Sequence, residues 1–535
     1  MPMISSYTIT LRAAQKRLSQ QSGFTLIVTL GVLLVTSLLL AAAFEASRGD
    51  VQLSHRSTVQ KQAYYAALAG VQEFEYRLQA NPNYWETCPT LERTVNPEPK
   101  AGEEHTAVKE SYTIELLPAS TAPKGTKACS ASNPFGTTIQ SSGAEANTFR
   151  IEAIGAAGNN AVSSSYATRS VVATFHVVGF LNYIYFTQYE DGDPSLYGGP
   201  PEECENYRAT REKLGAECDT IVFANGDTVE GPMHTDDATD ICGKAYFGRK
   251  EHNPPDEVQI NGGVYSTCGG AEPTFYTANG KSSVGPELLT PEGDTSLSTY
   301  VKEGGDEFTG STHIVLKGTT MSVTNSKNET KTYEWPTNGL VYVRAAEAGC
   351  GYNYEDSATN TDNATEVKEE TNCGNVYVSG SYSKPLTIAA EEDLIINGNI
   401  YPTGVALGSE PTGTNTLGLI AGHYVRIYHP LTSTNCGSAK NAEGSLENPW
   451  IYAAILSTNH SFAVDNFGCG NGLGNLNVDG AIAQRFRGVV GLTSGQGYIK
   501  DYKYDERLAV DEPPYFLNPL NAGWEVSRET MAGGG

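Results

Sequence analysis

An uncharged, apolar run over residues 24–44 is the feature that most constrains this chain. At the helical rise of about 1.5 Å per residue it reaches roughly 31 Å, which matches the hydrocarbon core of a bilayer. No acidic residue occurs in 1–23, whereas three basic residues do: Arg12, Lys16 and Arg17. This asymmetry predicts a cytoplasmic N-terminal side and a location beyond the membrane for the rest of the chain. The alternative is an ordinary secretory signal cleaved after Ala43, although such signals have a shorter apolar core.

The run opens with the sequence Ser22-Gly23-Phe24-Thr25-Leu26-Ile27. This segment resembles the class III signal of type IV pilins, pseudopilins and minor pilins. The resemblance implies that a prepilin peptidase cleaves between Gly23 and Phe24, that Phe24 is methylated, and that the apolar run is retained. The family usually has glutamate at the fifth mature position, where this chain has Val28, and valine cannot accept a charge-assisted hydrogen bond. This departure favours a minor or tip subunit over a major pilin.

The partners and location follow from the same resemblance and from the charge. The implied partners are the prepilin peptidase, other pilin subunits, the pilus assembly machinery and the membrane, which a single helix crosses. The implied location is the cytoplasmic membrane, with the bulk of the chain extracytoplasmic, and extracellular once assembled in a pilus. The net charge of −25 repels phosphates, so no nucleic acid is expected as a partner.

Ten cysteines without a Cys-x-x-Cys pair predict disulfides rather than a zinc or redox motif, because the bulk of the chain is expected beyond the membrane. Our hypothesis is that sequence neighbours pair, since each such bond closes a local loop. The expected pairs are Cys88–Cys129, Cys204–Cys218, Cys242–Cys268, Cys350–Cys373 and Cys436–Cys469. Free buried thiols are the alternative.

Helical periodicity continues beyond the membrane run. Small and apolar residues recur at helical spacing from Ala63 to Leu78, and Asn81-Pro82-Asn83 ends the pattern. We therefore expect one stem helix, since no sustained heptad supports a long coiled coil. Three segments with alternating apolar residues then predict a small antiparallel sheet packed on this helix: 112–116, 148–155 and 169–178.

A short glycine-containing unit recurs in the rest of the chain. Its usual pattern is apolar, any, apolar, Asn/Asp/Ser, Gly, any, apolar, as in Val258–Val264, Leu394–Ile400 and Leu476–Ile482. Strands hinged at glycine and stacked in coils are typical of a parallel β-helix, which we expect here. An antiparallel sandwich with glycine bulges is the alternative. The proline-rich, aromatic segment around 513–524 is expected to cap the exposed strand edges.

These patterns predict an α+β chain with a long N-terminal helix, a small antiparallel sheet and a large mostly-β domain. The expected divisions are a leader at 1–23, a stem helix at 24–80, a pilin-like sheet at 81–178 and the large domain at 179–535.

Candidates for chemistry are few. Ser381 and Lys384 match a Ser-x-x-Lys motif, but that motif needs a helix and here lies in a strand repeat. His423 and His429 could share one face of a strand, without an evident third metal ligand. The acidic turns at 190–193 and 236–240 could hold Ca²⁺, although turns with solvated charges are the favoured interpretation. We expect no catalytic residues, no metal and no cofactor.

The expected function is that of a minor type IV pilus subunit with a role in pilus assembly, adhesion or surface display. One alternative is a membrane-anchored β-helix protein that binds carbohydrate or acts on polysaccharides, which convergent carboxylates would favour. Another is a pseudopilin of a type II secretion system.

Overall fold

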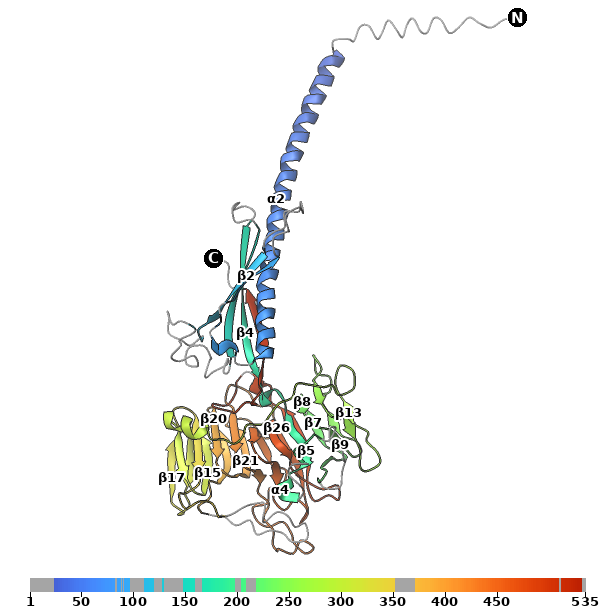
Figure 1. Ribbon diagram of the computed structural model, residues 1–535. Coiled ribbons are helices and arrows are strands. Elements are labelled where there is room, and N and C mark those ends of the chain that lie inside the picture. Colours follow the sequence, from blue (N-terminus) through green and yellow to red (C-terminus); the bar gives the residue numbers. More distant parts are fainter. Residues whose placement is uncertain are drawn as a thin grey trace, which may run out of the picture.

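A 57-residue helix, α2 (Phe24–Ala80), a small sheet and a large β-rich domain make up the protein in a computed structural model (Figure 1). The expected N-terminal helix and the mostly-β remainder are confirmed. The large domain lies at the C-terminal end of α2, and the N-terminal half of the helix projects away from it. The structure describes residues 24–81, 84–87, 89, 91–96, 110–119, 128, 148–158, 166–197, 204–207, 218–351, 371–509 and 511–531.

The small sheet is antiparallel throughout, in the order β1-β2-β3-β4-β28. Its strands are β1 (Leu91–Asn96), β2 (Glu110–Leu117), β3 (Thr148–Gly158), β4 (Tyr166–Val178) and β28 (Gly523–Met531). The last strand corrects the expected division at residue 178, because it follows the large domain in sequence yet pairs with β4. A pairing between segments this far apart leaves no local pattern in the sequence.

The second half of α2 packs on this sheet through small residues. Gly155 on β3 lies so close to the helix backbone at Ala63 and Ala67 that a Cβ atom there would overlap with it. Further along, the Phe74 ring is fully buried, 6.0 Å from the Phe149 ring and 5.6 Å from the Phe175 ring. The helix face that the sequence periodicity predicts to be apolar is therefore the face that covers the sheet.

Most neighbouring strands of the large domain are parallel. The longest ladder contains β14 (Asp306–Thr309), β18 (Leu340–Arg344), β20 (Leu386–Ala390), β22 (Leu417–Ala421), β24 (Trp450–Ser457), β26 (Gly472–Arg487), β5 (Tyr185–Gly192), β8 (Met233–Thr235) and β11 (Val258–Ile260). A second ladder contains β15 (Thr312–Gly318), β19 (Val376–Tyr382), β21 (Leu394–Pro402), β23 (Val425–Ile427) and β25 (Phe462–Val464). A third continues from β26 through β27 (Gly497–Tyr504), β7 (Thr228–Glu230), β10 (Tyr246–Phe247) and β13 (Thr274–Phe275).

The remaining strands make the large domain a mixed structure. β16 (Thr320–Thr324) and β17 (Thr330–Glu334) add to β15 in antiparallel fashion. A separate small sheet has the order β12-β9-β6 and consists of β12 (Val264–Tyr265), β9 (Thr239–Ile241) and β6 (Val222–Phe223). Short helices lie between the strands: η3 (Phe180–Asn182), α4 (Pro194–Tyr197), α6 (Leu297–Tyr300), η5 (Val301–Glu303) and η6 (Glu506–Ala509). Outside the large domain, η1 (Tyr84–Thr87) lies between α2 and β1.

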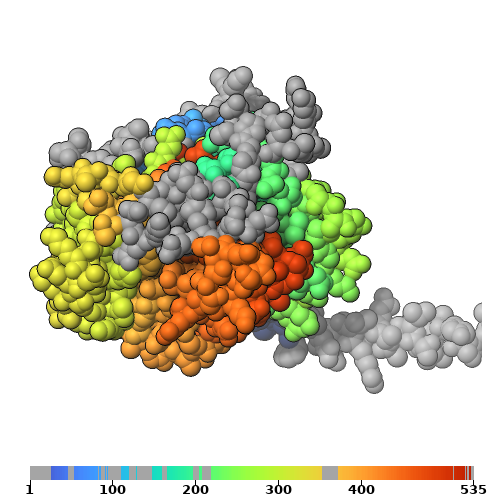
Figure 2. All heavy atoms as spheres, turned by 90° about the horizontal axis from the view of Figure 1, so that it is seen from below, coloured from blue at the N-terminus to red at the C-terminus, as the bar shows by residue number. Residues whose placement is uncertain are grey.

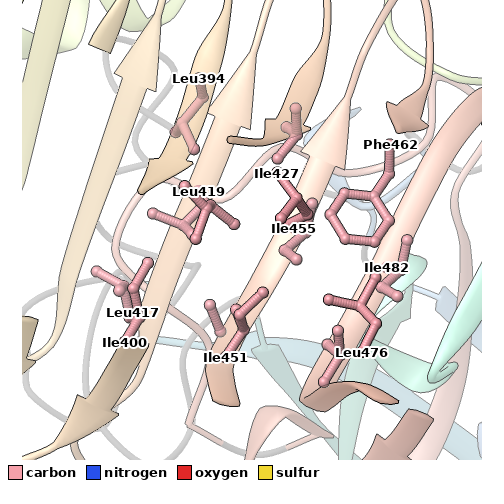
Figure 3. Packing of buried hydrophobic residues seen from close by; sticks show 14 of the residues in the cluster. Leu394, Ile400, Leu417, Leu419, Ile427, Ile451, Ile455, Phe462, Leu476 and Ile482 are labelled. Carbon is pink, nitrogen blue, oxygen red and sulfur yellow. The ribbon is translucent and has the colours of Figure 1, made fainter. Parts of the chain in front are cut away.

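Equivalent positions of the longest ladder stack in register and form the core. Leu419, Ile455 and Ile482 occupy one such row on successive strands and are fully buried (Figure 3). Burying a side chain of this size stabilises a fold by about 1.5–3 kcal/mol. Close packing explains why the repeat has glycine at this position, because a Cβ atom at Gly480 would overlap with the backbone oxygen of Ala453 on the neighbouring strand.

The chain enters the longest ladder in its middle. β5 pairs with β26 on one side and with β8 on the other. The segment 220–275 therefore extends the ladder from β5 toward one end of the domain. The segment 306–345 forms the other end. The strands of 371–504 fill the space between, and β26 among them pairs with β5. Figure 2 shows the green and yellow parts on opposite sides of the orange and red part.

Candidate functional site

The N-terminal half of α2 is apolar and uncovered. Leu26–Glu45 has a mean hydropathy of 2.6 and no buried part, and it is the one helix in the described part of the chain that is long and apolar enough to cross a membrane. This suits a membrane anchor or a signal segment. α2 begins at Phe24, whereas Gly23 lies outside the described residues, so cleavage and methylation there stay predictions.

Four of the five expected disulfides are formed, and all four lie in the large domain. The bonded pairs are Cys204–Cys218, Cys242–Cys268, Cys350–Cys373 and Cys436–Cys469. The fifth pair, Cys88 and Cys129, falls outside the described residues. The sequence separations, from 14 to 33 residues, show that each bond braces a local loop. Disulfides of this kind favour an extracytoplasmic location for the domain.

The first acidic turn, at 190–193, is buried rather than solvated, which corrects the favoured interpretation. Glu190 accepts a hydrogen bond from Nη1 of Arg487 at 2.7 Å. Asp193 accepts one from the Tyr424 hydroxyl at 3.1 Å and lies 2.7 Å from Nδ1 of His460. The turn is covered because β5 is an interior strand, and its partners come from segments much later in the sequence.

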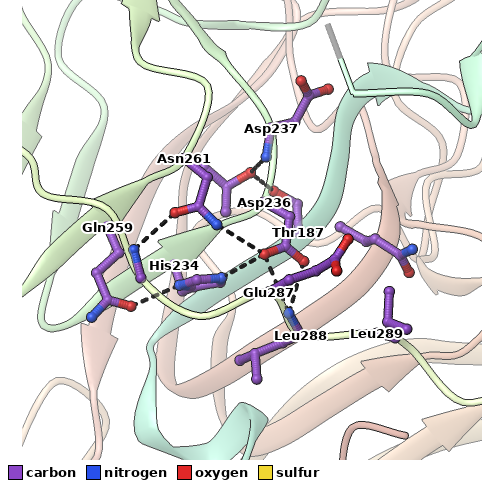
Figure 4. Close-up of polar contacts among 12 residues, drawn as sticks. Thr187, His234, Asp236, Asp237, Gln259, Asn261, Glu287, Leu288 and Leu289 are labelled. Atoms are coloured by element: carbon purple, nitrogen blue, oxygen red, sulfur yellow. Dashed lines mark hydrogen bonds and ion pairs between the residues drawn. The ribbon is translucent and has the colours of Figure 1, made fainter. Parts of the chain in front are cut away.

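The second acidic turn, at 236–240, is also buried, and its Asp236 side chain is hydrogen-bonded (Figure 4). Asp236 lies 2.9 Å from Nε2 of His234 and accepts hydrogen bonds from the Asn261 amide at 3.2 Å and from the Leu288 backbone N–H at 3.1 Å. Burial raises the pKa of Asp236, while its contact with His234 lowers it. These carboxylates tie neighbouring strands and the segment around Leu288 together. Among the described residues there is no group of three or more side chains that could hold a metal ion.

The two histidines singled out from the sequence do not meet. His423 is partly exposed and lies 2.9 Å from Glu392, whereas His429 is buried and contacts the backbone oxygen of Asp465 at 3.0 Å. The ring that does lie near His423 belongs to His460, with 5.2 Å between centroids. His423 lies between β22 and β23, and His460 lies between β24 and β25, the parallel neighbours of those two strands. The sequence separation alone could not show this.

The Ser-x-x-Lys match has no helix to assemble it. Ser381 lies in strand β19 and Lys384 lies in the turn that follows. The geometry that this motif requires is therefore not present, as the strand repeat predicts.

Buried cations are the polar residues that sequence reasoning missed. Nε of Arg426 lies 3.1 Å from Asp393, and its Nη1 lies 2.7 Å from Asp465, with all three side chains buried. Arg426 stands between Val425 and Ile427 in an apolar strand. An arginine in such a strand was the available signal, because a buried guanidinium needs buried counterions.

Two carboxyl groups with unequal surroundings lie on β26 and directly after its neighbour β27. Asp479 on β26 is 5% exposed, and burial together with the neighbouring charge of Asp505 raises the pKa of Asp479 to about 7. Asp505 instead accepts hydrogen bonds from Arg507, the shortest at 2.7 Å. Unequal carboxyls of this kind can take acid and base roles, although both are nearly covered here.

Comparison with known proteins adds no relative. No protein-family model, no curated protein and no solved structure matches this chain.

Proposed function

We propose that this chain is a minor type IV pilus subunit, anchored in the cytoplasmic membrane and then assembled in or at the tip of a filament. The observation that carries the proposal is the division of α2 into two halves. Leu26–Glu45 is apolar and unburied, whereas the half that contains Ala63 and Phe74 is buried on an antiparallel sheet. An uncovered apolar helix of this length needs a membrane or other apolar helices around it, and a pilin stem meets both in turn.

The sequence near the start of α2 supports the same proposal. Val28 at the fifth mature position fits a subunit that does not repeat throughout the shaft.

The large domain suits a rare or terminal position. It lies at the opposite end of the helix from the apolar half, where it can extend from a filament (Figure 1). We infer that its parallel ladders are coils of a β-helix, with the antiparallel pair β16 and β17 as an added hairpin. Such bulk is incompatible with tight packing at every filament position. The proposed roles are therefore assembly initiation, adhesion or display.

The mass of the N-terminal peptide of the membrane-extracted protein tests the proposal. A chain that starts at methylated Phe24 is the expected result, and Gly23→Val should retain the leader. A chain that starts after Ala43 would mean ordinary secretion and would contradict the proposal. Sheared filaments with as much of this subunit as of the major one would exclude the minor position.

The carboxyl pair Asp479 and Asp505 favours one second candidate, a polysaccharide-active or carbohydrate-binding role of the large domain. Reducing-end release from polysaccharides by the wild type, lost in Asp479→Asn and in Asp505→Asn, would support it. Equal behaviour of the three proteins would leave the pair with a structural role.

A further inference from the structure

Lys500 and Asp227 form a buried pair inside the large domain that the pilin role does not use. Nζ of Lys500 lies 2.8 Å from Oδ2 of Asp227, and the two residues are 5% and 2% exposed. Lys500 lies on β27, and Asp227 directly precedes β7, the parallel neighbour of β27. Lysine is almost never buried this deeply, because removing an ammonium from water is costly.

Burial and a neighbouring cation favour the neutral form of the amine. The guanidinium of Arg487 lies 3.8 Å from the centroid of the Phe223 ring, and Nζ lies 5.5 Å from the same centroid. The contact of Nζ with the ring itself favours the ammonium form. Burial lowers the pKa of Lys500 and the nearby charge of Arg487 lowers it further, against the opposite effect of Asp227. A neutral amine has the free lone pair that a nucleophile needs.

Two backbone N–H groups fix the carboxyl group of Asp227 in position for attack by the amine of Lys500. Its Oδ1 accepts a hydrogen bond from the backbone N–H of Lys500 at 3.1 Å, and its Oδ2 accepts one from the backbone N–H of Ala224 at 2.8 Å. Fixed backbone donors on both oxygens stabilise the negative charge that develops when a nucleophile adds to the carbonyl carbon. The short Nζ to Oδ2 distance keeps the amine beside that carbon, as a near-attack geometry requires.

A cleft of about 650 Å³ adjoins the pair. Lys500 and Asp227 both line it, together with the Cys242–Cys268 disulfide and the glycines Gly269 and Gly270. A small molecule released at the pair therefore has an exit that does not disturb the core.

From this geometry we propose that Lys500 and Asp227 condense to an intramolecular isopeptide bond. The ammonium passes one proton to Oδ2, which leaves a neutral amine beside a neutral acid. The lone pair of Nζ then forms a bond to Cγ, and the Cγ–Oδ2 bond breaks. Oδ2 leaves as water with two of the three ammonium protons, and the third remains on the amide nitrogen. The step consumes no oxidant, reductant or further reactant.

The bond would join β27, late in the sequence of the large domain, to the segment that directly precedes the early strand β7. β27 follows β26, which closes the domain on β5, and Asp227 lies on the coil formed early in the chain. The linked residues are 273 positions apart, whereas the described disulfides span at most 33. A covalent bond at this place would keep an early and a late segment of the domain together under pulling force, which suits a surface-displayed head.

Mass spectrometry of a tryptic digest of the reduced, full-length protein tests the inference. Trypsin should not cleave after Lys500, and the peptides 214–244 and 488–503 should appear as one species that is lighter than their sum by one water. Recovery of the two unlinked peptides, with cleavage after Lys500, would overturn the proposal and leave a buried ion pair. This result is independent of whether Phe24 is the mature N-terminus.

Two controls separate a specific bond from non-specific condensation. The exposed pair of Lys244 and Glu272, 3.8 Å apart, should stay unlinked in the same digest. Lys500→Arg keeps the positive charge but replaces the amine by a poor nucleophile, so the linked species should be lost completely. A linked species in Lys500→Arg would refute the assignment. If that variant does not fold, the wild-type digest alone decides.

Discussion

Trp524 lies edge-on against Phe149, with 4.7 Å between the ring centroids and 68° between the ring planes. Phe149 belongs to β3 and Trp524 to β28, so the contact joins the middle of the small sheet to a strand near the end of the chain. The chain thus leaves the small sheet after β4, builds the whole large domain, and returns. The large domain is an insertion with two connections to the small sheet, not an appended tail.

Replacing Trp524 should therefore destabilise the small sheet. We expect Trp524→Ala to lower the free energy of unfolding by about 3 kcal/mol, because a large buried ring leaves a cavity. Denaturant unfolding of the full chain in detergent measures this. Tyr76→Ala is the control, since Tyr76 lies on the part of α2 that packs on the small sheet and is 69% exposed. Equal stability of the two variants would mean that β28 does not secure the sheet.

Gly155→Val should separate the stem helix from the sheet. The Cβ atom of the new valine would overlap with the α2 backbone at Ala63 and Ala67. A helix backbone cannot shift aside as a flexible side chain can. We expect a loss of about 1–3 kcal/mol, typical of overpacking, and faster hydrogen exchange of α2 beyond Ala63. Gly523→Ala is the matched control, because no atom lies within 4 Å of the added Cβ. Unchanged exchange in Gly155→Val would contradict the close approach.

Arg426→Leu should leave the carboxylates of Asp393 and Asp465 buried and unpaired. Breaking a buried ion pair costs about 3–5 kcal/mol, so a large fall in the midpoint of chemical denaturation is expected. Arg344→Ala removes the partly exposed partner of Glu307 and should cost less than about 1 kcal/mol. A loss in Arg426→Leu no greater than in Arg344→Ala would show that water reaches the pair.

Asp479 should make the large domain less stable as the pH rises. Its pKa is about 7 in the folded chain and 3.8 in the ordinary reference state, so the folded state binds more protons between these values. Stability therefore falls as the pH rises from 4 to 7, since unfolding then releases a proton. Asp479→Asn should remove this part of the pH dependence and raise the melting temperature at pH 8. Asp501→Asn, on the neighbouring strand, is the control, and a pH profile shared by Asp479→Asn and the wild type would contradict the assignment.

Several features were predictable because they are local. The apolar run, the helical spacing from Ala63 to Leu78 and the alternation at 148–155 each follow from the period of one element. The four described disulfides could be paired because each closes a short loop.

The polar interior was not predictable in this way. Glu190 and Asp193 read as a solvated turn, because turn residues are polar and mostly exposed. Their burial depends on Arg487 and His460, which only the stacking of β26 and its neighbouring strands brings to β5. Asp393 and Asp465 meet Arg426 for the same reason.

The sequence by itself determined the elements of this protein: one long helix with an apolar and an amphipathic half, strands with glycine turns, and locally closed loops. Their local signals are short-range, since hydrophobic period and turn chemistry depend on neighbouring residues. The tertiary structure alone decided the order of the strands, the return of β28 to the small sheet and the pairing of Lys500 with Asp227. These depend on contacts across hundreds of residues, where many pairings satisfy the same local pattern and the packed core selects one.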